Sequence, residues 1–166
     1  LRDKLSNKEI LEKIKEEKPE AVGIGCLTAE YNVVTELSNL VKQAEIKVVI
    51  GGIHPTVLPY RTLIDSKADF VICGEGEIAL TKLALNNFEN KNIKGIYSLE
   101  NLKSDNDVFE YAEQTDNLDS IPFPSWEKFP PGAYNKRPAG LIYKKMPIGY
   151  VMTSRGCAYS CTFCSG

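Results

Sequence analysis

The sequence predicts an α/β fold built on an open, doubly wound parallel sheet. Short apolar runs with no polar alternation, typical of buried parallel strands, occur at 21–26, 47–50 and 70–73. Apolar residues recur at helical spacing in 33–44 and 78–87, which lie between and after these runs. Strands that alternate with helices at this pace indicate βαβ units with right-handed crossovers. The expected fold class is therefore flavodoxin-like, or Rossmann-like in the broader sense.

The first expected element is a helix over residues 7–17. Ser6 and Glu9 have the spacing of a capping box, and apolar residues follow at helical intervals. Pro19 ends this helix. No strand precedes it, and few strands follow for such a sheet, so we expect one or two N-terminal strands to be missing from this chain.

The remaining elements of the first domain follow in order. The apolar stripe within 33–44 is typical of a helix face that packs on a core. The strand at 47–50 is closed by Gly51 and Gly52, and 59–66 suggests a short helix. Residues 94–99 suggest a last edge strand.

The sequence changes character after residue 100. Residues 101–119 are polar and acidic with little periodicity, which predicts a linker or loose excursion. Residues 118–126 mix prolines with large apolar side chains, which favours a packed connector. A strand at 148–153 would begin a second domain. The predicted organisation is a first domain at 1–99, a connector at 100–146 and the start of a second domain at 147–166.

Composition excludes several classes of protein. The chain has 166 residues and a net charge of −2, so nothing suggests a nucleic-acid footprint. No apolar run approaches the roughly 20 residues of a membrane span, and no secretory leader is visible. The five cysteines, three of them clustered, fit metal chemistry in a reducing compartment better than disulfides. We therefore expect a cytoplasmic protein.

The clustered cysteines are the clearest chemical signal in the chain. Cys157, Cys161 and Cys164 have the spacing C-x3-C-x2-C. Three thiolates suit a four-iron cluster that leaves one iron open for a small molecule, which would make the site catalytic. The alternative is structural zinc, which needs a fourth ligand, and the other cysteines and the single histidine lie far upstream.

Small residues gather where the predicted strands end. These segments are Gly25–Thr28, Gly51–Thr56 and Gly74–Glu77. In open α/β sheets, ligands bind outside the carboxyl ends of the strands. Glycines at three such ends allow a large flat ligand to approach the backbone. We therefore expect a ligand site along this edge.

Four short motifs in order resemble one known family. They are Gly-Gly-x-His-Pro-Thr, Gly-Glu-Gly-Glu, Ile-Pro-Phe-Pro and Ser-Arg-Gly-Cys. Together they resemble cobalamin-binding domains fused in front of radical S-adenosylmethionine (SAM) domains, and the resemblance covers nearly the whole chain. It implies that the final segment begins a radical SAM barrel. It also implies cobalamin contacts at Cys26, Leu27, Thr28, Gly51, Gly52, Ile53, Gly74, Glu75 and Gly76.

The same resemblance implies two further cofactors. Cys157, Cys161 and Cys164 would hold a 4Fe-4S cluster that cleaves SAM to a deoxyadenosyl radical, with Phe163 packed near the adenine. The implied activity of the full-length enzyme is methyl transfer or a radical rearrangement, with electrons from a ferredoxin or flavodoxin. This fragment alone is expected to be inactive, and its sequence does not name a substrate. Two alternatives stay open: a radical SAM enzyme whose first domain does not bind cobalamin, and a zinc-stapled binding module without catalysis.

Some residues have simpler interpretations. His54 does not fit the Asp-x-His-x-x-Gly motif for a cobalt ligand, because Gly52 and Val57 occupy the flanking positions. We expect it to be a turn residue that caps its loop before a proline. Glu75 and Glu77 suit a helix N-terminus, a ligand contact or both.

A disulfide between the two upstream cysteines is not expected. One strand would separate Cys26 from Cys73, which places them about 9–10 Å apart. A disulfide needs Cα atoms within roughly 7 Å. Both are expected to be small buried apolar residues.

Overall fold

The computed structural model describes residues 5–128, 130, 154–157, 159 and 161–163. The chain divides into two compact units, one spanning Asp3–Phe123 and the other Leu1–Arg2 with Pro124–Gly166. All the described helices and strands lie in the first unit. The strand predicted at 148–153 lies outside the described residues.

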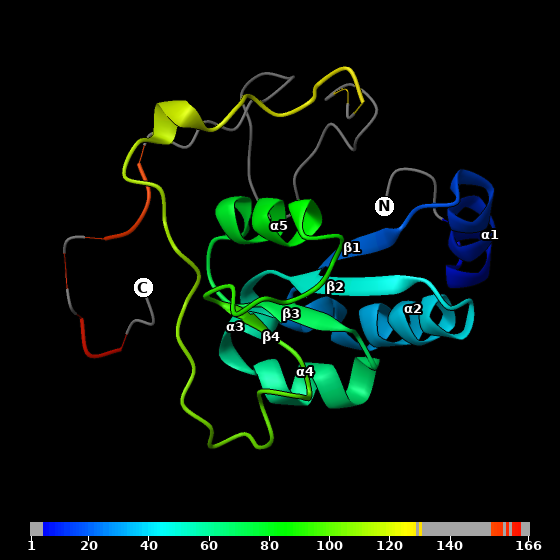
Figure 1. Cartoon of the computed structure of the whole chain (residues 1–166), viewed down its shortest axis with the longest axis horizontal. Coiled ribbons are helices and arrows are strands. Elements are labelled where there is room, and N and C mark those ends of the chain that lie inside the picture. Colours follow the sequence, from blue (N-terminus) through cyan, green and yellow to red (C-terminus); the bar gives the residue numbers. More distant parts are fainter. Residues whose placement is uncertain (1–4, 129, 131–153, 158, 160, 164–166) are drawn as a thin grey trace, which may run out of the picture. The chain divides into compact units, whose positions relative to one another are not determined.

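The first unit is built on a four-stranded sheet in the order β1-β2-β3-β4 (Figure 1). Its strands are β1 (Ala21–Gly25), β2 (Lys47–Gly51), β3 (Phe70–Ile72) and β4 (Ile96–Tyr97). The first three strands pair in parallel, whereas β4 is antiparallel to β3. The predicted fold class is confirmed, with β4 as a short antiparallel edge.

The direction of β4 follows from the path of the chain after α5. The Lys47 ammonium, at the start of β2, donates to the Phe88 carbonyl. The Cys73 N–H, just beyond the end of β3, donates to the Gly95 carbonyl at 2.8 Å. The intervening residues therefore return from the amino to the carboxyl edge of the sheet, and β4 must run back against β3.

Helices cover both faces of the sheet. They are α1 (Asn7–Glu17), α2 (Tyr31–Gln43), α3 (Ile53–Val57), α4 (Pro59–Ser66) and α5 (Gly76–Leu85). Figure 1 shows α2 and α4 on one face and α5 on the other. Among the described helices, none is long and apolar enough to cross a membrane.

Two hydrophobic cores explain the continuous apolar runs of the central strands. Val48 and Ile50 of β2 belong to the cluster that includes Val34 and Leu63 of α2 and α4. Val49 points to the other face and belongs to the cluster that includes Leu83 of α5. A parallel strand buried on both faces cannot alternate apolar with polar residues, which is the pattern that the sequence shows.

The opening helix has the predicted boundaries and cap. The Ser6 side chain accepts from the Glu9 N–H, and the Glu9 carboxylate accepts from the Ser6 N–H at 2.8 Å. Lys18, in the left-handed conformation, caps the other end. Leu11 and Ile14 pack against the core that lies under α2 and α4.

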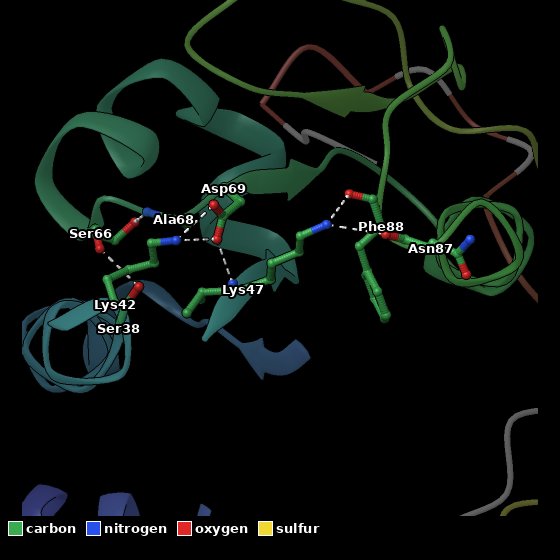
Figure 2. Close-up of polar contacts among 9 residues, drawn as sticks. Ser38, Lys42, Lys47, Ser66, Ala68, Asp69, Asn87 and Phe88 are labelled. Atoms are coloured by element: carbon green, nitrogen blue, oxygen red, sulfur yellow. Dashed lines mark hydrogen bonds and ion pairs between the residues drawn. The ribbon is translucent and has the colours of Figure 1, made fainter. Parts of the chain in front are cut away.

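The amino ends of the strands are closed by polar contacts (Figure 2). Both oxygens of Asp69 accept from the Lys42 ammonium at 2.7 Å, and one also accepts from the Val48 N–H at 2.7 Å. The Ser38 hydroxyl donates to the Ser66 carbonyl at 2.8 Å. This edge is thereby tied to α2 and α4.

The chain after β4 packs on the first unit. Leu102 is 1% exposed and Ala112 is 5% exposed, and the Ala112 N–H donates to the Cys73 carbonyl at 2.7 Å. The unit therefore continues to Phe123, whereas the sequence predicted a domain that ends at 99. The apolar residues that anchor this segment are few and irregularly spaced, so they produce no periodic pattern.

Candidate functional site

The carboxyl ends of β1, β2 and β3 meet along one edge of the sheet. Cys26 follows β1, Gly52 leads from β2 into α3, and Gly74 leads from β3 into α5. The strand register aligns Gly25 with Gly51 at this edge. The structure thus brings together the strand-end residues that the sequence predicted as one site.

One face of β1 and β2 is bare backbone at this edge. Gly23 and Gly25 are exposed, and the strand register aligns them with Val49 and Gly51, on the face of the sheet where α5 packs over β3. A Cβ added to Gly23, Gly25 or Gly51 would meet no atom within 4 Å. We call these three residues the glycine face. It leaves the backbone open to close approach by a ligand.

Gly52 holds the loops after β1 and β2 together. Its φ is 107°, and a Cβ there would lie 2.8 Å from the Cys26 carbonyl oxygen. The Cys26 N–H donates to the Gly51 carbonyl at 2.8 Å, and the His54 N–H donates to the Cys26 carbonyl at 3.2 Å. Only glycine allows both this conformation and this approach.

Two threonine side chains join the strand ends to one another. His54 Nδ1 lies 3.2 Å from Thr28 Oγ1, which links the loops after β1 and β2. The Thr56 hydroxyl donates to the Gly52 carbonyl at 2.8 Å and accepts from the Gly74 N–H at 2.9 Å. These contacts connect all three loops at the edge.

His54 is buried rather than a capping turn residue. It is 6% exposed, and its ring packs on Tyr31 with centroids 4.1 Å apart. Its Nε2 atom is buried with no hydrogen-bond partner among the described residues. The predicted role is wrong, because Gly52 lets the chain begin the short helix α3 at once and the imidazole turns inward.

Large apolar side chains stand exposed on the loop after β1 and on α3. Leu27 is 49% exposed, Ile53 is 65% exposed and Val57 is 61% exposed. They belong to the loop after β1 and to α3, which the backbone contacts above join. We call these residues the apolar rim. An apolar rim at the edge of a parallel sheet is typical of a ligand site.

The two upstream cysteines are structural. Cys26 is 2% exposed, Cys73 is fully buried, and both are free thiols, as predicted. Burial raises the pKa of Cys73 to about 12. Burial, assisted by the nearby Glu30, also raises the pKa of Cys26. Cys26 therefore contributes its backbone to the site, and its thiol stays protonated at neutral pH.

The glutamates at the start of α5 occupy helix N-terminal positions. Glu75 is the N-cap residue and Glu77 lies in the first turn. Carboxylates there complement the helix dipole, which confirms the structural part of the prediction. Gly76 lies between them, and a Cβ added to it would meet no atom within 4 Å.

The cysteine motif lies in the second unit. Cys157 and Cys161 are exposed, and Phe163 is 91% exposed. Cys164 lies outside the described residues. In the part of the chain that the structure describes, no group of three histidine, cysteine, aspartate or glutamate side chains could hold a metal ion. The cluster stays a prediction.

Some contributors to the site were not singled out from the sequence. Gly23 is one of them: it alternates with Gly25 within a strand, and period-2 spacing places both on one face, so this signal was available. The linking role of Thr56 and the contact between Tyr31 and His54 depend on tertiary packing. No local pattern reports such contacts.

Comparisons with known proteins find relatives that match nearly the whole chain. An uncharacterized methyltransferase of Pyrococcus horikoshii is 33% identical over 171 residues, covering 99% of this chain and 35% of its own length. The cytidylyl-2-hydroxyethylphosphonate methyltransferase of Streptomyces wedmorensis is 28% identical, with coverages of 99% and 36%. The anaerobic magnesium-protoporphyrin IX monomethyl ester cyclase of Cereibacter sphaeroides is 28% identical, with coverages of 98% and 27%. The chain thus spans about a third of the length of these relatives.

The family match covers the part of the chain that forms the site. The B12 binding domain family matches residues 2–84, which include the glycine face, the apolar rim and the start of α5. The resemblance drawn from the strand-end motifs is therefore confirmed, and the chain belongs to the B12-binding domain family.

Proposed function

We propose that the unit Asp3–Phe123 binds cobalamin along the carboxyl ends of β1, β2 and β3. The glycine face is the observation that carries this proposal, since bare backbone lies open there and the loops that follow β1 and β2 carry exposed apolar side chains. The family match to a B12 binding domain supports the same ligand.

The residues present suit the parts of such a ligand. Leu27 and Ile53 offer exposed apolar surface to the corrin ring. Gly25 and Gly51 leave room for an extended tail to lie against the backbone. The amino end of α5 at Gly76 presents backbone N–H groups and a partial positive charge that suit phosphate or amide oxygens.

The chain's single histidine is not arranged as a lower cobalt ligand. His54 Nδ1 is occupied by Thr28, and Nε2 is shielded from solvent. We therefore propose that this chain binds cobalamin without a histidine ligand from its own residues.

We further propose that the full-length protein is a cobalamin-dependent radical SAM enzyme. Cys157, Cys161 and Cys164 would hold a 4Fe-4S cluster, with Phe163 beside the bound SAM. The spacing of the cysteines supports this assignment. When bound, the cluster and SAM supply a deoxyadenosyl radical, with electrons from a ferredoxin or flavodoxin in the cytoplasm. Two of the relatives are named methyltransferases and one is named a cyclase. These names favour methyl transfer as the reaction, with ring closure as the alternative.

Anaerobic reconstitution of the full-length protein with iron, sulfide and hydroxocobalamin tests both parts. We expect corrin absorption bands and about four irons per chain. Iron without corrin would contradict cobalamin binding by the first unit. Zinc in place of iron would contradict the enzymatic proposal.

A further inference from the structure

At the proposed cobalamin site, the buried side chain of His54 contacts the exposed side chain of Thr28. The imidazole is 6% exposed, whereas Thr28 lies on the exposed loop after β1. Their side chains meet at 3.2 Å between Nδ1 and Oγ1. His54 is the only side-chain partner of this hydroxyl in the described part of the chain.

The unpartnered Nε2 atom decides which nitrogen carries the proton. A neutral imidazole has one N–H donor and one bare nitrogen acceptor. Nε2 is buried without a partner among the described residues. In protein backbones, unpaired buried N–H groups are rarer than unpaired acceptors, and the same desolvation argument applies to an imidazole nitrogen. The favoured tautomer therefore leaves Nε2 bare and places the proton on Nδ1.

This tautomer fixes the polarity of the Thr28 hydroxyl. With a proton on Nδ1, the imidazole donates and Thr28 Oγ1 accepts. The hydroxyl hydrogen of Thr28 then has no acceptor among the described residues, and it is available to a ligand because Thr28 is exposed. The opposite tautomer would use up that hydrogen and leave Thr28 with acceptor capacity only.

We propose that His54 is a positioning residue that keeps Thr28 as a hydrogen-bond donor to an acceptor atom of the ligand. This inference rests on the proposed function, because the ligand is taken to be cobalamin. It explains why a buried imidazole with an orphaned nitrogen is held at this edge by Tyr31 stacking and by the His54–Cys26 backbone bond.

The tautomer can be measured without any ligand. The chain contains one histidine, so its two imidazole nitrogens give a single pair of ¹⁵N resonances in the full chain. Couplings to the two ring hydrogens identify which resonance is Nε2. We expect a protonated Nδ1 and a bare Nε2. A protonated Nε2 would overturn the proposal whether or not cobalamin binds.

Substitutions test whether His54 acts through Thr28. Titration of the full chain with hydroxocobalamin should show about tenfold weaker binding for Thr28→Val and for His54→Phe, the loss of one hydrogen bond. The double variant should be no weaker than Thr28→Val, because His54 is proposed to act only through Thr28. A hundredfold loss in the double variant would overturn the proposal.

A matched pair of variants separates the donor from the shape of the ring. His54→Asn places an amide N–H where Nδ1 lies, and should bind within about twofold of the wild type. His54→Gln places its amide further out, and should bind like His54→Phe. Equal binding by both variants would overturn the proposal, and circular dichroism confirms that each is folded. Failure of the wild type to bind hydroxocobalamin would instead contradict the proposed function. The tautomer of His54 could still be measured in that case, because the measurement needs no ligand.

Discussion

Gly25 is the residue at which access to the backbone can be tested most directly. It lies at the end of β1, on the glycine face, with no atom within 4 Å of an added Cβ. Gly25→Val should therefore fold, with a free energy of unfolding that is unchanged or higher by up to about 1 kcal/mol. The new side chain would occupy ligand space, so hydroxocobalamin should bind at least about tenfold more weakly by absorption titration.

Ala21→Val is the matched control for this prediction. Ala21 lies on the same face of β1, about 13 Å from Gly25 along the strand. The Ala21→Val variant should bind hydroxocobalamin with wild-type affinity. Full affinity in Gly25→Val would show that the ligand does not lie against this face.

Cys73 should make the stability of the chain depend on pH in the alkaline range. Burial raises the pKa of this thiol from 9.0 to about 12. Between these values the folded chain keeps a proton that the unfolded chain has lost. The free energy of unfolding should therefore fall as the pH rises from 9 to 12, by at most about 1.4 kcal/mol per pH unit from this group.

Denaturant unfolding under reducing conditions at several pH values measures this slope. Cys73→Ala should make this slope shallower, and the raised pKa values of Tyr31 and Tyr97 account for what remains. The same change at the exposed Cys161 should leave the slope as in the wild type. An identical slope in both variants would show that Cys73 is not the source.

At the scale of elements, the antiparallel strand β4 and the segment after it close one side of the first unit. Gly95 precedes β4 with a φ of 79°, and a Cβ there would lie 2.3 Å from the backbone of Ala112. Gly95→Ala should therefore lower the free energy of unfolding by about 2–4 kcal/mol. It should also speed proteolysis within residues 100–113, as followed by mass spectrometry.

Gly23→Ala is the control for that substitution. Its added Cβ meets no atom within 4 Å. The free energy of unfolding should be unchanged or slightly higher. Equal stability of both variants would mean that residues 100–113 do not depend on contact with Gly95.

The sequence predicted most elements because local signals were strong. The capping box placed the start of α1 at Asn7, as the structure has it. The buried runs placed β1, β2 and β3 to within about a residue at each end. The helix at 59–66 has its predicted bounds because Pro59 stands at its first position.

What the sequence did not predict depends on contacts between distant residues. The direction of β4 is set by the return path to Gly95, and the packing of residues 100–113 by isolated side chains such as Leu102. At the site, the strand-end loops could be predicted from their glycines. The burial of His54 could not, because it follows from the conformation of Gly52 and the Tyr31 ring.

At the scale of the whole molecule, the two units should bind their proposed cofactors independently. The proposed cobalamin site lies within Asp3–Phe123, and Cys157 and Cys161 lie in the other unit. A full-length variant with Cys157, Cys161 and Cys164 all changed to serine should lack iron by metal analysis. Its hydroxocobalamin affinity should be within about twofold of the wild type, because none of these residues belongs to the glycine face or the apolar rim. Loss of both cofactors would mean that the sites are coupled.

The threonine links at the strand ends have a thermodynamic consequence for recognition. Thr28 with His54, and Thr56 with Gly52 and Gly74, fix the three loops before any ligand arrives. Loops that are already ordered lose little conformational entropy on association, so more of the contact energy appears as affinity. The backbone of this edge should therefore differ by less than about 1 Å between ligand-free and ligand-bound crystals. The ligand would therefore bind a preformed site, and the strand-end loops would not need to become ordered on binding.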